Sequence, residues 1–150
     1  RTLVDMVARG GNLLLNVGPT ARGEIDERAL ARLEGIGRWM RHHSRAIYGC
    51  TQAPPEFKAP ENCRLTYNPK TNRLYVHLYA WPYKQLWLDG VYRDRVEYAQ
   101  LLHDASEVPF MGLEAWQHHY KDQEGNTLPL TLPVNQPNTP VPVIELFLKK

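Results

Sequence analysis

The carboxylates Glu24 and Asp26 are separated by one residue, a spacing at which two acidic groups could do chemistry together. Paired carboxyl groups can serve as general acid and base, or as nucleophile and acid. These two, however, stand at the start of a helical pattern that runs from about Asp26 to His43. Acidic side chains at this position accept hydrogen bonds from the first helical turn and balance the helix dipole. We therefore predict that they cap the helix and are not catalytic.

Histidine and cysteine, the residue types that most often bind metals, occur here at unfavourable spacings. His42 and His43 are adjacent, as are His118 and His119. Adjacent side chains point in different directions on a helix and to opposite faces on a strand, so they chelate a metal poorly. Cys50 and Cys63 flank a Pro-rich loop and could be brought together. We favour two unpaired cysteines, and we expect no metal site, disulfide scaffold or cofactor.

Composition excludes some partners. The chain has 150 residues, of which 43% are hydrophobic, enough to bury a core. A net charge of +2, with +3 through Cys50 and −1 beyond it, is too small to indicate nucleic acid or a membrane surface. No apolar run approaches the ~20 residues of a membrane span. We expect neither nucleic-acid nor membrane partners.

The first 49 residues read as helix, strand and helix. Leu3–Arg9 is amphipathic, residues 12–17 form an apolar strand, and the long helix follows a break at Gly18–Gly23. A strand that is apolar on both faces belongs in a parallel sheet covered by helices, so we expect its neighbours to lie outside this chain. The helix shows one apolar stripe, expected to be buried, made of Ile25, Ala29, Leu33, Ile36 and Met40.

Beyond residue 50 the pattern changes to short strands. Eleven of the twelve prolines lie there, and residues 51–62 read as an extended Pro-rich connector. Residues 68–72 look like a hairpin turn. Strands with a period of two are predicted at 64–67, 74–79, 85–88, 95–102, 113–118, 128–132 and 143–148. Short strands separated by turn residues indicate an antiparallel β-sandwich.

Several of these segments resemble one known family. Leu3–Val7, Gly11–Pro19 (GNLLLNVGP), Ile36–Met40 and Ala46–Gly49 (AIYG) strongly resemble the α-L-fucosidase family of retaining glycoside hydrolases, in its usual order and spacing. Looser likenesses to the family's C-terminal sandwich follow at Arg73–Val76, Trp81–Pro82, Leu101–Leu102 and Leu130–Pro133.

The resemblance implies an α+β fragment that contains the last strand-helix unit of a (β/α)8 barrel, followed by a C-terminal antiparallel β-sandwich. Residues 1–49 would be the end of the catalytic barrel, namely the end of helix 7, strand 8 and helix 8. Residues 50–62 would be the Pro-rich connector and residues 63–150 the sandwich. The presumed strand 8 would have unpaired edges on both sides, so we expect that the isolated chain can self-associate through it.

The family releases terminal α-linked fucose with an aspartate nucleophile and a carboxylic acid/base. A retaining mechanism needs two carboxyl groups about 5–5.5 Å apart. In the family both lie upstream of the segment that matches Gly11–Pro19, so the resemblance places no catalytic residue in this chain. We therefore expect the chain alone to be inactive. Its implied partners are fucosylated glycans, through the parent enzyme, and the remainder of the barrel. The implied location is secreted, periplasmic or lysosomal.

Asn16 is the one candidate substrate-binding residue. It lies at the C-terminal end of the presumed strand 8, and active sites of barrels are built at that end. Its amide could line the sugar pocket or support a residue that does. The alternative, which we favour, is that Asn12 and Asn16 hydrogen-bond to loop backbone.

Aromatic residues leave a different class of function open. Trp81, Tyr83, Trp87 and Trp116 could stack on sugar rings, or they could pack in the core or between domains. We favour packing, and we expect Trp39 to pack against the sandwich or the barrel. The alternatives to an enzyme part are thus a carbohydrate-binding sandwich module and a purely structural interaction domain.

Overall fold

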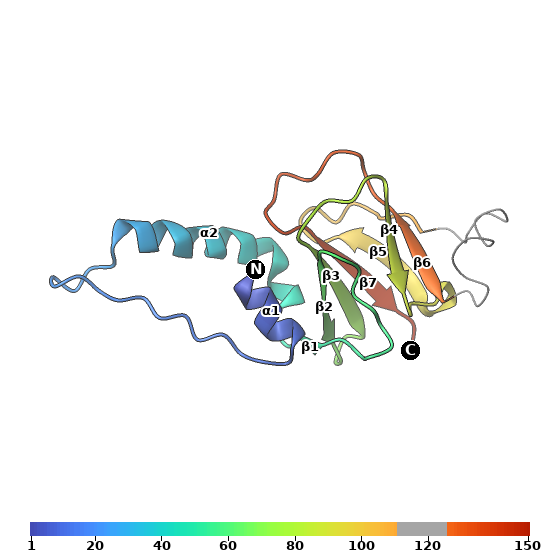
Figure 1. The fold of residues 1–150 in the computed structure, drawn as a ribbon, viewed down its shortest axis with the longest axis horizontal. Coiled ribbons are helices and arrows are strands. Elements are labelled where there is room, and N and C mark those ends of the chain that lie inside the picture. The colour runs from blue at the N-terminus through green and yellow to red at the C-terminus, as the bar shows by residue number, and fades with distance from the viewer. Residues whose placement is uncertain (111–125) are drawn as a thin grey trace.

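The computed structural model describes residues 1–110 and 126–150. Two antiparallel sheets lie on one side of the molecule and two helices extend to the other (Figure 1). The larger sheet has the order β1 (Thr51–Gln52), β2 (Cys63–Asn68), β3 (Arg73–Leu78), β7 (Val143–Leu148) and β5 (Val96–Leu101). The smaller sheet pairs β4 (Gln85–Asp89) with β6 (Thr127–Thr131).

Six of the seven predicted strands are observed within one or two residues of their expected bounds. The seventh, predicted at 113–118, lies outside the described residues. The turn at 68–72 joins β2 to β3 as predicted, since the Asn68 side chain accepts hydrogen bonds from the backbone of Lys70 and Thr71. All strand pairs among the described residues are antiparallel. The predicted α+β class with antiparallel sheets is therefore confirmed.

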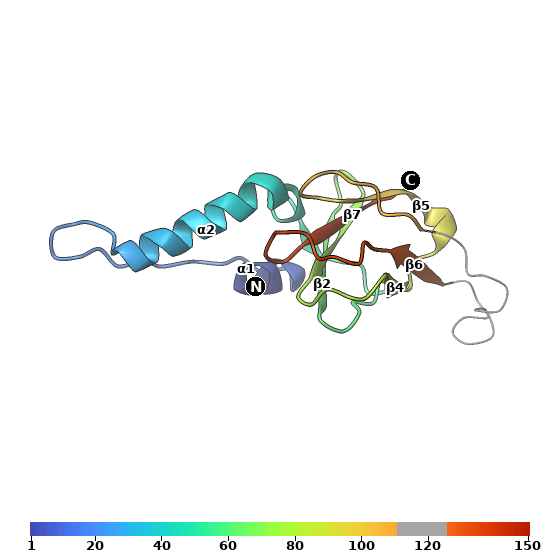
Figure 2. The ribbon, with the colours of Figure 1, turned by 90° about the horizontal axis from the view of Figure 1, so that it is seen from above.

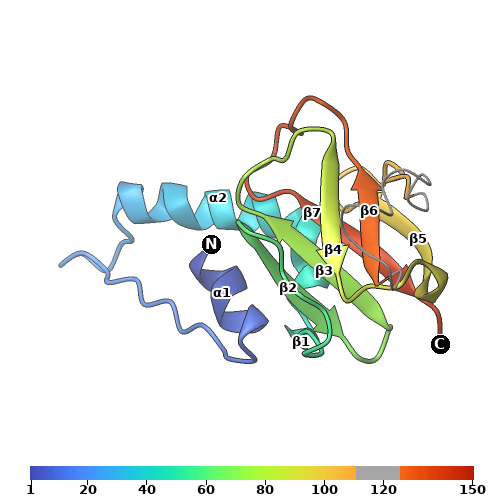
Figure 3. The ribbon, with the colours of Figure 1, turned by 45° about the vertical axis from the view of Figure 1, so that its right-hand side comes forward.

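The hydrophobic core lies between the two sheets (Figure 3). Alternate residues of β3 and β7 point into it, because successive side chains on a strand face opposite ways. Leu74, Val76 and Leu146 come from the larger sheet, and Leu88 and Leu128 from the smaller; all five are fully buried.

The segment 50–62, expected to be only a connector, also belongs to this packing. Thr51–Gln52 pairs with β2 as a short edge strand. Phe57 enters the core, and the Lys58 amide donates to the Asp89 carbonyl at 3.0 Å. The prolines thus shape a segment that is fixed against the sheets and is more than a linker.

The two helices form as predicted. Helix α1 spans Thr2–Ala8 and α2 spans Glu27–His43, followed by a 3-10 turn, η1 (Ser44–Ala46). A second 3-10 turn, η2, covers Arg93–Arg95. The Asp26 carboxylate accepts a hydrogen bond from the Arg28 amide at 3.0 Å, so its predicted capping role is confirmed. Figure 2 shows α2 reaching away from the sheets.

One expectation for the helical part stays a prediction and another is wrong. Residues 12–17 are extended (Figure 1) but are not hydrogen-bonded as a strand, because no other strand among the described residues lies beside them; the expected strand, with its neighbours outside this chain, is therefore not tested. The apolar stripe of α2 is not buried: Ile25 is 46% exposed and Ile36 is 42% exposed, while Leu14 in the extended segment is 86% exposed. Both observations have the same physical cause, which is that nothing in the described chain covers this side of the helices.

Candidate functional site

Buried polar side chains gather on the face of the larger sheet that turns away from the core. The end of α2 and η1 cover part of this face, where Thr66 Oγ1 donates to the Ala46 carbonyl at 2.8 Å. The buried polar residues on these strands are Thr66, Tyr75, His77, Gln100 and Glu145.

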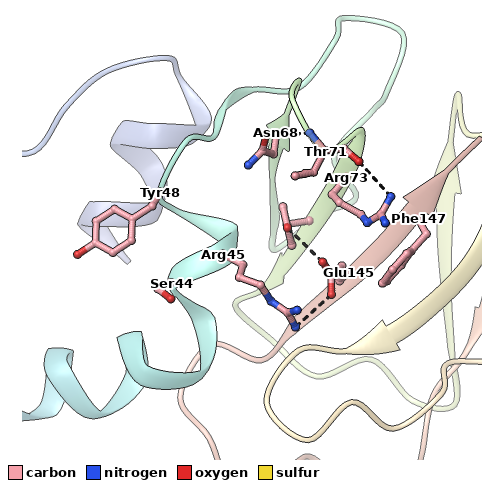
Figure 4. A pocket seen from close by; sticks show the side chains of 9 residues that line it. Ser44, Arg45, Tyr48, Asn68, Thr71, Arg73, Glu145 and Phe147 are labelled. Carbon is pink, nitrogen blue, oxygen red and sulfur yellow. Dashed lines mark hydrogen bonds and ion pairs between the residues drawn. The ribbon is translucent and has the colours of Figure 1, made fainter. Parts of the chain in front are cut away.

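Glu145 on β7 is the charged group at the centre of this layer. Its side chain is 3% exposed. Tyr75 Oη donates to Oε1 at 3.2 Å, and Gln100 Nε2 donates to Oε2 at 2.7 Å. Arg45, which is 58% exposed, places Nη2 at 3.4 Å from Oε2 (Figure 4). Burial and the Glu145 charge raise the pKa of Tyr75, so its hydroxyl keeps the proton that it donates.

A surface hollow of about 420 Å³ lies beside Glu145. The guanidinium carbon of Arg73 lies 3.8 Å from the centre of the Phe147 ring, and Arg73 Nη1 donates to the Thr71 carbonyl at 3.0 Å. Arg45 approaches the same hollow from η1 (Figure 4). Two arginines, one buried carboxylate and several hydroxyl groups therefore share one concave surface.

This arrangement lacks the pair of carboxyl groups that acid/base or nucleophilic hydrolysis uses. The polar contacts of Glu145 come from Tyr75, Gln100 and Arg45, with no second carboxyl among the described residues that contact it. A carboxylate held by three donors serves to position its neighbours. Asp26 is likewise engaged, since Arg28 contacts both of its oxygens at the start of α2.

Two histidines are buried where α2 meets the sheet. His77 Nε2 lies 2.9 Å from Thr66 Oγ1, and His43 Nδ1 donates to the Trp39 carbonyl at 2.9 Å. Their other ring nitrogens are buried without a hydrogen-bond partner among the described residues. Burial lowers the pKa of both, that of His77 to about 3, so both are neutral near pH 7.

These histidines and the cysteines do not assemble into a metal centre. Over residues 1–110 and 126–150, no group of three or more metal-ligating side chains comes together. Cys50 and Cys63 are both unpaired, as favoured from the sequence. Burial raises the pKa of each thiol to about 11, which suits structural rather than reactive cysteines. The pair His118–His119 lies outside the described residues. No helix of the described chain is long and apolar enough to cross a membrane.

Asn16 lies far from these groups, in the extended segment between α1 and α2. Its side chain is exposed and has no hydrogen-bond partner among the described residues, so the favoured bonding to loop backbone is not observed. Beside this segment an apolar groove of about 520 Å³ runs between α1 and α2, with Leu13, Leu15, Ile36 and Trp39 in its lining. The role of Asn16 at a sugar pocket stays a prediction.

The aromatic residues mostly pack. Trp81 lies against the core and donates its indole N–H to the Pro133 carbonyl at 3.0 Å, and Trp87 on β4 is half-buried. Trp39 packs against the sheet, as expected. Tyr83 is 73% exposed. Trp116 lies outside the described residues.

Glu145 and its partners were missed by sequence reasoning, although one signal was present. A charged residue stands inside the otherwise apolar strand Val143–Leu148. Buried charges need partners, so such a residue predicts a polar network on that face of the sheet.

Comparisons with known proteins agree with one another. A sequence profile of the family described as "Alpha-L-fucosidase" matches residues 1–45. The tissue α-L-fucosidase of Rattus norvegicus is 29% identical over 138 residues, 91% of this chain and 28% of that protein. The α-L-fucosidase of Dictyostelium discoideum is 51% identical over 47 residues, which are 31% of this chain and 10% of that protein.

Solved structures extend the match to the whole chain. Alpha-L-fucosidase isoenzyme 1 from Paenibacillus thiaminolyticus aligns with a TM-score of 0.85 and 36% identity over 100% of this chain and 34% of its own. The Thermotoga maritima α-fucosidase aligns with a TM-score of 0.73 and 27% identity over 97% of this chain and 32% of its own. The chain thus spans about a third of the length of these relatives. Profile, sequence and structure thus agree that this chain is similar to the C-terminal part of α-L-fucosidases.

Proposed function

We propose that this chain forms the C-terminal part of a retaining glycoside hydrolase that releases terminal α-linked L-fucose. The observation that carries the proposal is the alignment of the entire chain with 34% of the Paenibacillus thiaminolyticus enzyme. The catalytic carboxylates then belong to the remaining two-thirds, and this chain alone is inactive. In this proposal residues 1–49 complete the barrel and residues 63–150 form a sandwich that supports the barrel. Residues 50–62 connect the two.

The uncovered apolar surface supports association with the rest of a barrel. Leu14 and Leu15 are 86% and 53% exposed, and Ile36 is 42% exposed beside the groove between the helices. An extended segment without partners and an apolar helix face are what the last strand and helix of a barrel present when their neighbours are removed. In the assembled enzyme, residues 12–17 become a parallel strand with a neighbour on each side.

The alternative function, a carbohydrate-binding or structural module that acts by itself, has weaker support. Three of the candidate stacking residues fall within the described chain, namely Trp81, Tyr83 and Trp87, and Tyr83 is the only one of these three that is strongly exposed. A single exposed ring makes no line of stacking platforms. The large apolar surface around Leu14 also fits a part of a larger enzyme better than an independent module.

A chimera tests the proposal. The C-terminal third of the Paenibacillus thiaminolyticus enzyme is replaced by this chain, and hydrolysis of a chromogenic α-L-fucoside is measured. We expect the folded chimera to hydrolyse the substrate, while this chain alone and the truncated enzyme do not. Turnover by the chain alone above a purified blank, or a folded chimera without activity, would contradict the proposal.

The same chimera tests Asn16. If its amide lines the sugar pocket, Asn16→Ala raises KM or lowers kcat at least about tenfold, the effect of losing one hydrogen bond of about 1.4 kcal/mol. Asn12→Ala, at the other end of the same segment, is the matched control and leaves both constants unchanged. Equal behaviour of the two variants would remove Asn16 from the pocket.

A further inference from the structure

We name the hollow beside Glu145 the two-arginine hollow, after Arg45 and Arg73. The proposed association with the rest of the barrel does not involve the charged and polar groups of this hollow. The hollow lies over β3 and β7 at the end of η1, whereas the apolar groove between α1 and α2 has a separate set of lining residues. Figure 4 shows the side chains of Arg45 and Arg73 reaching toward it from two elements.

Charge in the hollow favours an anion. The buried Glu145 carboxylate balances one arginine, which leaves a net positive charge among these three groups. A guanidinium group has five N–H donors. Arg45 contacts Glu145 through Nη2, and Arg73 donates through Nη1 to the Thr71 carbonyl. The remaining donors are available, and forked donors suit a carboxylate or sulfate group.

The arginines are also held in place. The guanidinium of Arg73 lies on the Phe147 ring, at 3.8 Å from its centre, and that of Arg45 lies against Glu145, which Tyr75 and Gln100 fix from beneath. Side chains ordered before binding lose less conformational entropy when a ligand arrives. The hollow is therefore more than two solvated surface charges.

Neutral groups around the arginines suit a polyhydroxylated ligand. Ser44 and Thr71 contribute hydroxyl groups, whereas the ring of Tyr48 points away from the two arginines (Figure 4). Asn68 uses its amide oxygen for the backbone of the β2–β3 turn, so its NH₂ group is the end left to donate. Short hydroxyl and amide groups near a charged anchor are the usual means of fixing a sugar's orientation.

We propose that the two-arginine hollow binds an acidic saccharide, with its carboxylate or sulfate group between Arg45 and Arg73 and its hydroxyl groups against Asn68 and Thr71. The choice of a saccharide rests on the proposed function as a glycan hydrolase part. The site is a binding site and takes no part in bond cleavage. It would hold an acidic residue of a glycan outside the barrel.

Calorimetric titration of the 150-residue chain at fixed ionic strength tests this. The probes are methyl β-D-glucuronide and galactose 6-sulfate, with methyl β-D-glucoside as the neutral sugar and sodium sulfate as the free anion. We expect each acidic sugar to bind at least about tenfold more tightly than the neutral sugar and the free anion. Only the acidic sugars can contact both the arginines and the neutral polar side chains of the hollow.

Substitutions then locate the site. We expect Arg73→Gln and Arg45→Gln each to weaken binding at least about tenfold, and Arg73→Lys to retain part of it because it keeps the charge but not the fork. Arg38→Gln, at an exposed arginine paired with Glu34 on α2, is the matched control and leaves affinity unchanged. Because Arg73 makes no hydrogen bond or ion pair with Glu145, its variants keep the test valid if Arg45→Gln fails to fold.

Three outcomes would overturn the inference: no binding of acidic sugars, equal binding of neutral and acidic sugars or of free sulfate, or affinity unchanged in Arg73→Gln. None of them bears on fucoside hydrolysis, which is measured separately in the chimera. An active chimera whose C-terminal part binds no acidic sugar would refute this inference and leave the proposed function intact.

Discussion

The indole ring of Trp39 lies parallel to the imidazole ring of His43, with the ring centres 4.6 Å apart and the planes 6° apart. The two residues are one helical turn apart on α2, and His43 Nδ1 donates to the Trp39 carbonyl. Trp39 Nε1 donates to the Val141 carbonyl at 3.2 Å, just before β7. The stacked pair thus fixes the end of α2 to the sheet.

Trp39 is accordingly expected to contribute strongly to stability. Trp39→Ala removes a half-buried aromatic side chain and should lower the free energy of unfolding by about 2–3 kcal/mol, somewhat less than for a fully buried tryptophan. Trp39→Phe keeps most of the apolar contact but loses the hydrogen bond to Val141, and should cost about 1 kcal/mol. Urea unfolding followed by circular dichroism measures both. Equal losses for the two variants would show that ring packing contributes little.

The buried histidines predict a loss of stability in mild acid. The pKa of His77 is lowered to about 3 by burial and by the nearby His43, whose own pKa is lowered by burial. An unfolded histidine has a pKa of about 6.5, so below that value the unfolded chain binds protons that the folded chain does not. Stability is complete well above pH 6.5 and should fall by about 1 kcal/mol per pH unit for His77 as the pH decreases toward 5, and His43 adds a loss of the same sign.

Urea unfolding at several pH values between 7.5 and 5.5 checks this slope. His77→Gln, whose amide can still donate to Thr66, should flatten it. His42→Gln, at the exposed neighbour of His43, is the control and should leave the slope unchanged. A wild-type slope near zero across this range would mean that the buried rings do not stay neutral as the pH falls.

The Glu145 network predicts unequal effects of its two charged members. Glu145→Ala leaves the donors of Tyr75 and Gln100 without their acceptor inside the structure, and should cost about 3 kcal/mol. Arg45→Ala removes an ion pair from a side chain that is 58% exposed, and should cost less than about 1 kcal/mol because water screens it. Chemical denaturation of both variants and of the double variant gives their coupling. Similar losses for the two single variants would contradict this account.

Alanine substitutions at Gly90 and Gly37 are expected to change stability in opposite directions. Gly90 has a φ of +79° after β4, and a Cβ added there would collide with the backbone carbonyl of Glu56. Gly90→Ala should therefore destabilise the chain by about 3 kcal/mol or more. Gly37 lies inside α2 with open space around it, so Gly37→Ala should stabilise by about 0.5–1 kcal/mol. Thermal unfolding should show opposite shifts, and a neutral Gly90→Ala would refute the proposed collision.

The local pattern of the sequence predicts most of the fold. The alternation of apolar and polar residues in segments such as 74–79 depends on neighbours close in sequence, and so does the helix cap at Asp26. Strand β3 and helix α2 are therefore found almost where they were expected. Burial of Ile36 depends on what lies opposite in space, and the prediction failed because that surface has no cover in the described chain. The partners of Glu145 lie 45 and 70 residues away in sequence, and no local pattern shows which residues meet.

The position of β7 in the larger sheet also has a consequence for how the chain folds. β7 lies between β3 and β5, yet it follows every other described strand in the sequence. β3 and β5 each pair with β7 and not with each other, so they are not joined into one sheet until residues 143–148 are in place. During synthesis on a ribosome, the hairpin of β2 and β3 can form early, but the sheet stays divided until β7 emerges. Contacts between residues so distant in sequence fold slowly, so we expect closure of this sheet to limit the folding rate.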